Sequence, residues 1–228
     1  MNQAADAAPD TLRISLDAKA TVKVGPFSRG GKSRVPTDAA DHDFQPLASV
    51  TPVGIFLPER DELFLYGVTS KVTADCLVDR LEQWWEQVRE RFVSIRTLVV
   101  NLDNGPENHS RRTQFLCRMV QFAHTSDLTI RLAYYPPYHS KYNAVERCWG
   151  ILENHWNGVL LDTIDAVIAF AKSMTWKGVH PSVELVTTSY ATGVTLTKEA
   201  MTALETQVAR LPQLEKWFVE IVPSRPLG

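Results

Sequence analysis

The stretch RTLVVNLDNGPENHSRRTQF, residues 96–115, decides the fold class. Its first part, Arg96–Leu102, is a continuous apolar run of strand length, which is typical of a strand in the middle of a sheet. Asp103–Gly105 has the composition of a turn. Pro106 suits the first position of a helix, and we expect that helix to run to about His124. A buried strand followed by an acidic turn and a helix indicates an α/β protein.

The sequence on either side predicts further strands and helices. Thr11–Asp17 alternates apolar and polar residues, as a half-buried strand does. We predict the other strands at Thr21–Val24, Val53–Leu57, Glu62–Val68, Leu128–Tyr134 and Lys216–Val222. We predict the other helices at Thr73–Phe92, Ser140–Trp156, Thr163–Ser173 and Lys198–Arg210. This order predicts a mixed sheet flanked by helices. We expect residues 1–10 to be a disordered leader, 11–185 to form one domain, and 186–228 to be an extension packed on its core.

The composition is that of an ordinary globular protein, with 228 residues, 44% apolar and 22% charged. Its net charge of -2 excludes a globally basic nucleic-acid binder. Positive charge is instead concentrated locally, because residues 18–35 contain five cations and no acid. Those cations are Lys19, Lys23, Arg29, Lys32 and Arg34.

Several other functions find little support in the sequence. The three cysteines form no CxxC pair, which makes a zinc site or a disulfide framework unexpected. No apolar stretch is long enough to cross a membrane, and the first residues lack the pattern of a signal peptide. The stretch GPFSRGGKS (25–33) has five residues rather than four between Gly25 and Gly31, so we expect no nucleotide cofactor. A cytoplasmic protein is the simplest expectation.

Three acids lie where an α/β sheet commonly places an active site. Asp17 ends the first predicted strand, Asp103 follows the buried strand, and Glu146 lies in the helix after the next strand. Carboxylates that converge at strand ends can hold Mg²⁺, which prefers oxygen ligands. Two such ions can stabilise the attacking and leaving oxygens when a phosphodiester is cleaved. Glu153, two turns beyond Glu146, is a further acid that could support the site or simply lie on the surface.

These stretches resemble a known family. LVVNLDNGPENHSRRTQF (98–115) is similar to the second-Asp region of DDE transposases and retroviral integrases. YYPPYHSKYNAVERCWGILE (134–153) is similar to their third-acid region, where Asn, Glu and Trp follow one another at intervals of three, here Asn143, Glu146 and Trp149. RISLDAKATVKVG (13–25) resembles the first-Asp strand of bacterial insertion-sequence transposases.

The resemblance implies a ribonuclease-H-like catalytic domain over residues 11–185, with Asp17, Asp103 and Glu146 as catalytic residues and metal ligands. It implies two Mg²⁺ ions, for which Mn²⁺ can substitute. The expected activity is metal-dependent DNA cleavage and strand transfer at transposon ends. The expected partners are double-stranded DNA, both transposon ends and target, and further copies of the chain in a homodimer or larger assembly. The expected location is the bacterial cytoplasm, in association with the nucleoid.

Other polar residues are expected to assist. Asn104 and Asn143 are candidates for orienting water or phosphate. The expected DNA contacts are Lys19, Lys23, Arg29, Lys32, Arg34 and Lys141.

Two alternatives remain open from the sequence. One is a catalytically silent DNA-binding or assembly module derived from a transposase. The other is a different carboxylate hydrolase, such as a glycosidase with an Asp/Glu pair. The Asp-Asn-Gly strand end and the Asn-x-x-Glu helix do not favour the second alternative.

Overall fold

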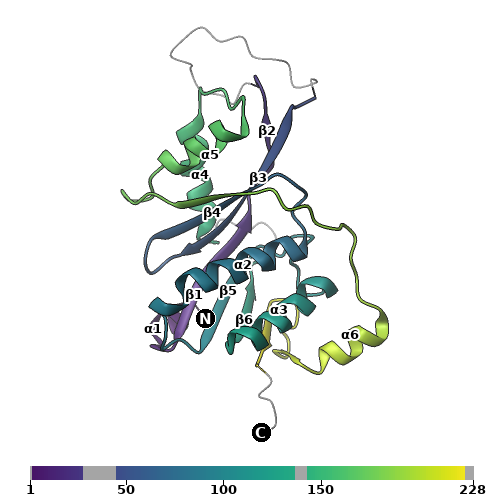
Figure 1. The fold of residues 1–228 in the computed structure, drawn as a ribbon. Helices are drawn as coiled ribbons and strands as arrows, with labels where there is room; N and C mark the ends of the chain where they lie inside the picture. The colour runs from purple at the N-terminus through teal and green to yellow at the C-terminus, as the bar shows by residue number, and fades with distance from the viewer. Residues whose placement is uncertain (1, 28–44, 137–142, 224–228) are drawn as a thin grey trace.

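The computed structural model describes residues 2–27, 45–136 and 143–223 (Figure 1). The helices are α1 (Asn2–Ala7), α2 (Ala74–Val88), η1 (Arg89–Arg91), α3 (Thr113–Ser126), α4 (Val145–Trp156), α5 (Ile164–Ser173) and α6 (Lys198–Glu205). The strands are β1 (Thr11–Ala18), β2 (Val22–Val24), β3 (Ala48–Leu57), β4 (Glu62–Val68), β5 (Thr97–Leu102), β6 (Thr129–Tyr134), β7 (Ser182–Val186), β8 (Val208–Arg210) and β9 (Phe218–Ile221). Within these ranges no helix is both long enough and apolar enough to cross a bilayer.

The strands form a mixed sheet in the order β7-β4-β3-β1-β5-β6-β9-β8, with β2 paired to β3. At its centre β1, β5 and β6 run parallel to one another. β3 runs antiparallel to both β1 and β4, and β9 runs antiparallel to β6. Helices cover the sheet on both sides (Figure 1). The expected α/β class, with a mixed sheet flanked by helices, is confirmed.

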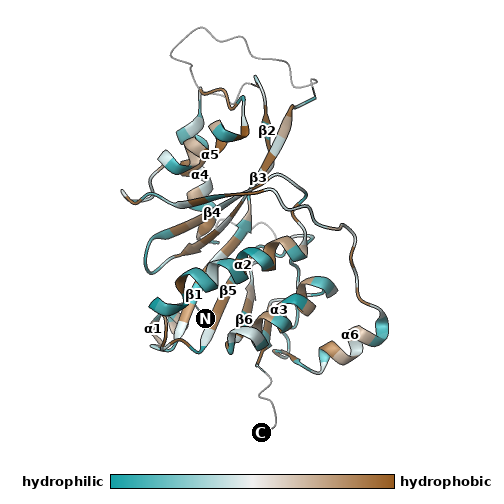
Figure 2. Cartoon of the chain, viewed as in Figure 1, coloured by the Kyte–Doolittle hydropathy of each residue, from teal (hydrophilic) through white to brown (hydrophobic). Residues whose placement is uncertain are grey.

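One face of the sheet carries the larger core. α2 and α3 lie side by side across it, and α6 packs beside α3 (Figure 1). Leu12, Ile14 and Leu16 of β1 point to this face, where they meet buried side chains of α2 such as Trp84. The strands are mainly apolar, with polar positions between the apolar ones in β1, whereas α2 and α3 carry many polar residues (Figure 2). The alternation along β1 therefore sends its intervening polar residues to the opposite face.

The opposite face is covered in two parts. α4 and α5 pack on β3 and β4 through a second apolar cluster that includes Val145, Trp149 and Leu152. α1 covers the neighbouring strands, where Ala5 is packed with Val99 and Ala133.

The expected disordered leader is instead partly helical, since Asn2–Ala7 forms α1. Arg13 of β1 donates two hydrogen bonds to the carboxylate of Asp6, at 2.6 and 2.8 Å. A helix of six residues is not stable alone, so these tertiary contacts hold it. Periodicity in the sequence could not reveal them.

Other element boundaries also differ from expectation. The helix expected from Pro106 begins at Thr113, because residues 103–112 form a series of turns. β7 was not predicted at all. The last part of the helix expected at Lys198–Arg210 forms β8 instead.

The C-terminal segment contributes strands to the sheet as well as packing on it. β9 pairs with β6, and β8 pairs with β9. Arg210 of β8 donates to the carbonyl oxygen of Ser110 at 3.0 Å, and thereby contacts the turns that follow β5.

We expect Asp6→Asn to loosen α1 because it weakens the paired hydrogen bonds from Arg13. The free energy of unfolding should fall by up to about 1 kcal/mol, the usual scale for a partly exposed ion pair. Amide hydrogen exchange of residues 2–7 should become faster. The matched control is Asp10→Asn, because Asp10 accepts from Thr11 rather than from Arg13. Unchanged exchange in the Asp6 variant would contradict this account of α1.

Candidate active site

Strand pairing brings Asp17 and Asp103 to the same level of the sheet. Ser15 pairs with Asn101 in the parallel ladder between β1 and β5. Asp17 and Asp103 each lie two residues further along. Because partners in a parallel pair point to the same face, both carboxylates are directed to the face that α4 covers. They lie at the carboxyl ends of neighbouring strands, as the sequence predicted.

Asp17 is buried, with 5% of its surface exposed, and a tryptophan holds it. The indole Nε1–H of Trp149 donates to Oδ2 of Asp17 at 2.7 Å. Gly54 of β3 pairs with Asp17 on the other side of β1. A Cβ atom at Gly54 would come within 2.6 Å of the Trp149 ring. The indole therefore reaches the carboxylate by lying over a position that has no side chain.

The start of α4 is fastened to β1 by a buried serine. The hydroxyl of Ser15 donates to Oδ1 of Asn143 and accepts from the backbone N–H of Val145 at 3.0 Å. Both Ser15 and Asn143 are fully buried. Glu146 is the next residue of α4 after Val145. The serine therefore fixes the first turn of the helix, and with it the position of the third acid.

Asp103 is held by its own turn. Its Oδ1 accepts from the backbone N–H of Gly105 at 3.1 Å and from Nδ2 of Asn108 at 3.0 Å. No hydrogen bond reaches its Oδ2 from the described residues. A Cβ atom at Gly105 would lie 3.1 Å from Oδ2 of Asp103 and 3.3 Å from Oδ1 of Asn108. The carboxylate oxygens of Asp103 and the amide oxygen of Asn108 therefore lie in the space that a side chain at Gly105 would occupy.

The three acids influence one another electrostatically. Burial raises the pKa of Asp17 to about 7; the Trp149 hydrogen bond opposes this, and the charges of Asp103 and Glu146 add to it. Burial and the charge of Asp103 also raise the pKa of Glu146 above its usual value, against the effect of Lys19. Burial together with like charge is the pattern expected of carboxylates gathered for a cation.

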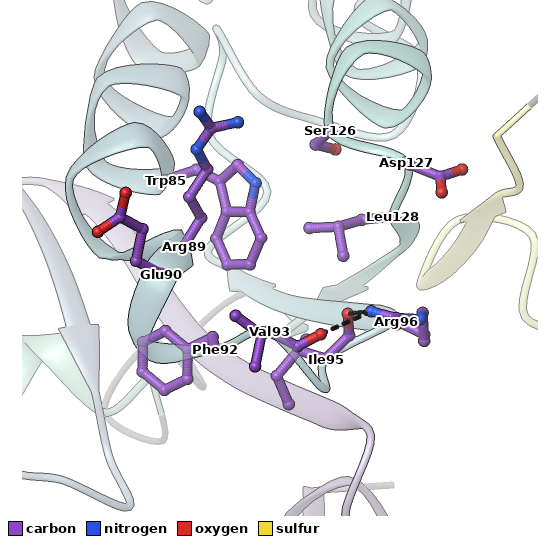
Figure 3. A pocket seen from close by; sticks show the side chains of 10 residues that line it. All are labelled: Trp85, Arg89, Glu90, Phe92, Val93, Ile95, Arg96, Ser126, Asp127 and Leu128. Carbon is purple, nitrogen blue, oxygen red and sulfur yellow. Dashed lines mark hydrogen bonds between the residues drawn. The ribbon is translucent and has the colours of Figure 1, made fainter.

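Asp17 and Asp103 line a cavity of about 220 Å³ at this end of the sheet. Its wall includes Leu77 of α2 and also Gly105 and Asn108. A different cavity, of about 350 Å³, lies where β5 and β6 begin (Figure 3). There Arg96 points its guanidinium at the carbonyl oxygens of Val93 and Ile95, at 2.9 Å each. That cavity is at the opposite end of the strands from the acids, so the smaller cavity is the candidate active site.

The donor atoms of the acid cluster suit a hard divalent cation. All three acids offer carboxylate oxygen, which Mg²⁺ prefers. Among the described residues, no three His, Cys, Asp or Glu side chains are close enough to hold a single ion together.

The other predicted site residues that the structure describes form contacts within the protein. Asn143 bonds Ser15 and is fully buried, which leaves its side chain no access to substrate. Oδ1 of Asn104 accepts from the N–H of Ser110 at 3.4 Å, within its own loop. Lys19 forms an ion pair with Glu153 at 2.7 Å, and the ammonium of Lys23 lies 5.5 Å from the centre of the Phe27 ring. Arg29, Lys32, Arg34 and Lys141 lie outside the described residues.

Several contributors to the site were missed from the sequence. Ser15, Gly54 and Asn108 were not singled out, and Trp149 was noted without a role. The alternation of β1 does place Ser15 on the same face as Asp17, which was an available signal. Nothing local distinguishes Gly54 or Asn108, because their importance comes from contacts made across the fold.

We expect Gly54→Ala to disturb the hydrogen bond between Trp149 and Asp17. Its new methyl group would overlap the indole, and such overpacking costs about 1–3 kcal/mol. The matched control is Gly150→Ala on α4, where an added Cβ meets nothing within 4 Å. The control should raise the free energy of unfolding by about 0.5–1 kcal/mol, because glycine is unfavourable inside a helix. Urea denaturation measures both values, and equal effects would contradict the packing described for Gly54.

The burial of Asp17 also predicts how stability depends on pH. Its pKa is 3.8 when exposed and about 7 in the folded chain. Folding therefore favours the protonated carboxyl, and this contribution to stability is lost as pH rises through about 7. Asp17→Asn cannot lose a proton. In EDTA, its stability relative to wild type should rise from pH 5 to pH 8 by at least about 1 kcal/mol. A stability of Asp17→Asn relative to wild type that stays constant between pH 5 and pH 8 would contradict the prediction.

Comparison with known proteins identifies the family. The model of the family described as "Rhodopirellula transposase DDE domain" matches residues 1–223. No curated protein matches the chain. Among solved structures, the "Mos1 transposase paired-end complex with left transposon end" is similar with a TM-score of 0.49 and 10% sequence identity. The match covers 68% of this chain and 45% of the Mos1 chain, so this chain spans less than half of that relative. The family match extends over nearly the whole sequence and includes all three acids, and the chain belongs to this family of transposase DDE domains.

Proposed function

We propose that the chain catalyses metal-dependent DNA cleavage and strand transfer at transposon ends, with Asp17, Asp103 and Glu146 as its catalytic residues. The observation that carries this proposal is the position of the three acids. They lie at one end of the sheet, and each of the three pairs is close enough to shift a pKa. Two of them line a cavity open to a ligand.

Asp17 would contribute to both ion sites, one shared with Asp103 and one with Glu146. Mg²⁺ is the expected ion, and Mn²⁺ is the natural substitute because it also accepts oxygen ligands. Two ions held in this way would supply charge stabilisation for the attacking and leaving oxygens of a phosphodiester. In this proposal each ion is held by two of the acids, and no ion contacts all three.

Residues of the chain would keep these acids in place during the reaction. Trp149 fixes the orientation of Asp17, and Ser15 fixes the start of the helix that bears Glu146. In the first step a water oxygen attacks the phosphorus atom at the end of the element. The bond from phosphorus to the 3′ oxygen breaks, and a 3′-hydroxyl and a 5′-phosphate result. In the second step that 3′-hydroxyl attacks a target phosphodiester, and a target 3′-hydroxyl is released.

Double-stranded DNA would approach the end of the sheet that carries the acids. Arg111, in the turns after Asp103, and Arg147, next to Glu146, are both exposed there. Lys23, which is exposed on β2, would add positive charge. Arg29, Lys32, Arg34 and Lys141 stay proposed DNA contacts. We also propose that further copies of the chain assemble on the DNA, and that the protein acts in a bacterial cytoplasm at the nucleoid.

We expect purified protein to nick supercoiled plasmid DNA, and to join pre-cleaved duplex ends to it, only with Mg²⁺ or Mn²⁺ present. Asp103→Asn keeps the size of the side chain but removes its charge, and should lower the rate at least about 100-fold because it removes a metal ligand. Gel electrophoresis of time courses gives the rates. The matched control is Glu86→Gln, an exposed residue on α2 that pairs with Arg89.

The result also separates the alternatives. DNA binding without cleavage, identical in wild type and Asp103→Asn, would favour a silent binding module instead. Cleavage that persists in EDTA or in Asp103→Asn would reject the proposed site.

A further inference from the structure

We propose that Asn108 is a further member of the divalent-cation site: its amide nitrogen holds Asp103, and its amide oxygen accepts a hydrogen bond from the water shell of an ion bound there. The inference rests on the proposed function, since it concerns the same acids. Asn108 lies in the turns between β5 and α3 and lines the cavity that contains Asp17 and Asp103.

The orientation of the Asn108 amide is fixed by its neighbour. Nδ2 donates to Oδ1 of Asp103 at 3.0 Å. Rotating the amide by half a turn would place its oxygen against the carboxylate oxygen, and two acceptors would face one another. The nitrogen must therefore face Asp103, and the oxygen must face elsewhere.

That oxygen is buried and has no hydrogen-bond partner among the described residues. Asn108 is 95% buried, since 5% of its surface is exposed. An unsatisfied buried acceptor costs on the order of 1–3 kcal/mol, so such groups are uncommon unless a water molecule or an ion completes them. The cost is unexplained if Asn108 only stabilises its turn.

The same oxygen lies near the carboxylate of Asp103. A Cβ atom at Gly105 would meet both carboxylate oxygens of Asp103, at 3.1 and 3.2 Å, and Oδ1 of Asn108 at 3.3 Å. Three oxygen atoms therefore surround one point, and none of them can donate a hydrogen to another. Such a group of acceptors is stabilised by a cation or by water that a cation polarises, and bound cations in proteins commonly have polar neighbours of this kind beyond their direct ligands.

The first test is Mn²⁺ affinity, measured by electron paramagnetic resonance of the free ion without DNA. Asn108→Leu keeps the approximate size of the side chain and removes both polar atoms. It should weaken Mn²⁺ binding about 10–100-fold, the usual effect of losing a residue that supports metal ligands. Its melting temperature in EDTA should stay near that of wild type, because the unsatisfied oxygen is removed along with the donor. The matched control is Asn154→Leu, at an exposed position of α4.

A second variant isolates the oxygen. Asn108→Asp keeps an oxygen in this position and loses the donor, so it should retain Mn²⁺ affinity within about threefold of wild type, a smaller loss than removal of the whole polar group causes. If Asn108→Leu binds Mn²⁺ as wild type does, or if Asn108→Asp loses as much affinity as Asn108→Leu, the proposal is wrong.

A third measurement tests the proposal even if Asn108→Leu does not fold. In wild type labelled with ¹⁵N-asparagine, the side-chain amide resonance of Asn108, identified by its absence in Asn108→Asp, should shift on addition of Mg²⁺. A resonance that does not move overturns the role of Asn108. Failure of the proposed function gives a different result. Either wild type binds no Mn²⁺, or Asp103→Asn binds Mn²⁺ as tightly as wild type does. In both cases the proposed function and the role of Asn108 are wrong together.

Discussion

Backbone hydrogen bonds between the parallel strands β1 and β5 set where the first two acids lie. Their register pairs Ser15 with Asn101, and Asp17 and Asp103 each follow two residues later. The same register turns Leu16 and Leu102 into the larger core. A slip of one residue would turn the acids into that core and the leucines toward the face that α4 covers. The apolar packing of α2 and α3 therefore fixes the position of the carboxylates, although neither helix contributes one.

The third acid depends on a different kind of contact. Glu146 comes from a helix, and apolar packing against β3 and β4 permits a helix some freedom to slide or rotate. Two polar contacts with β1 remove that freedom: Ser15 holds the first turn of α4, and Trp149 bonds Asp17 one turn later. The acid lies between these two contacts along the helix. Because Trp149 also requires the glycine at position 54, strand β3 takes part in the same arrangement.

The parts of the fold that were predictable from the sequence are those with a local pattern. β4 was predicted with its observed bounds, and the helix over α2 was predicted from its apolar stripe. The acids could be proposed because each follows or accompanies a recognisable element. α1 could not be foreseen, because its stability comes from Arg13 and from apolar neighbours distant in sequence.

The turns after Asp103 could not be predicted from the local sequence either. Pro106 is a good first residue for a helix, and local preference alone supports a helix there. In the structure, hydrogen bonds from Gly105 and Asn108 to Asp103 stabilise turns instead. Arg210 holds the far end of these turns from the C-terminal segment. Competition between a local preference and contacts made by distant residues is not visible in a single stretch of sequence.

The hydrogen-bond partners of Asp17 and Asp103 are neutral groups, and no cationic side chain among them cancels a carboxylate charge. Lys19 lies close enough to lower the pKa of Glu146, yet its ammonium pairs with Glu153. In the described part of the chain no lysine or arginine forms an ion pair with Asp17 or Asp103. Asp17 bonds a neutral indole and Asp103 bonds neutral amides, and these groups orient a carboxylate without cancelling its charge. The arrangement found here makes the charged acids costly where they gather, so that a cation binding there would favour their ionised forms.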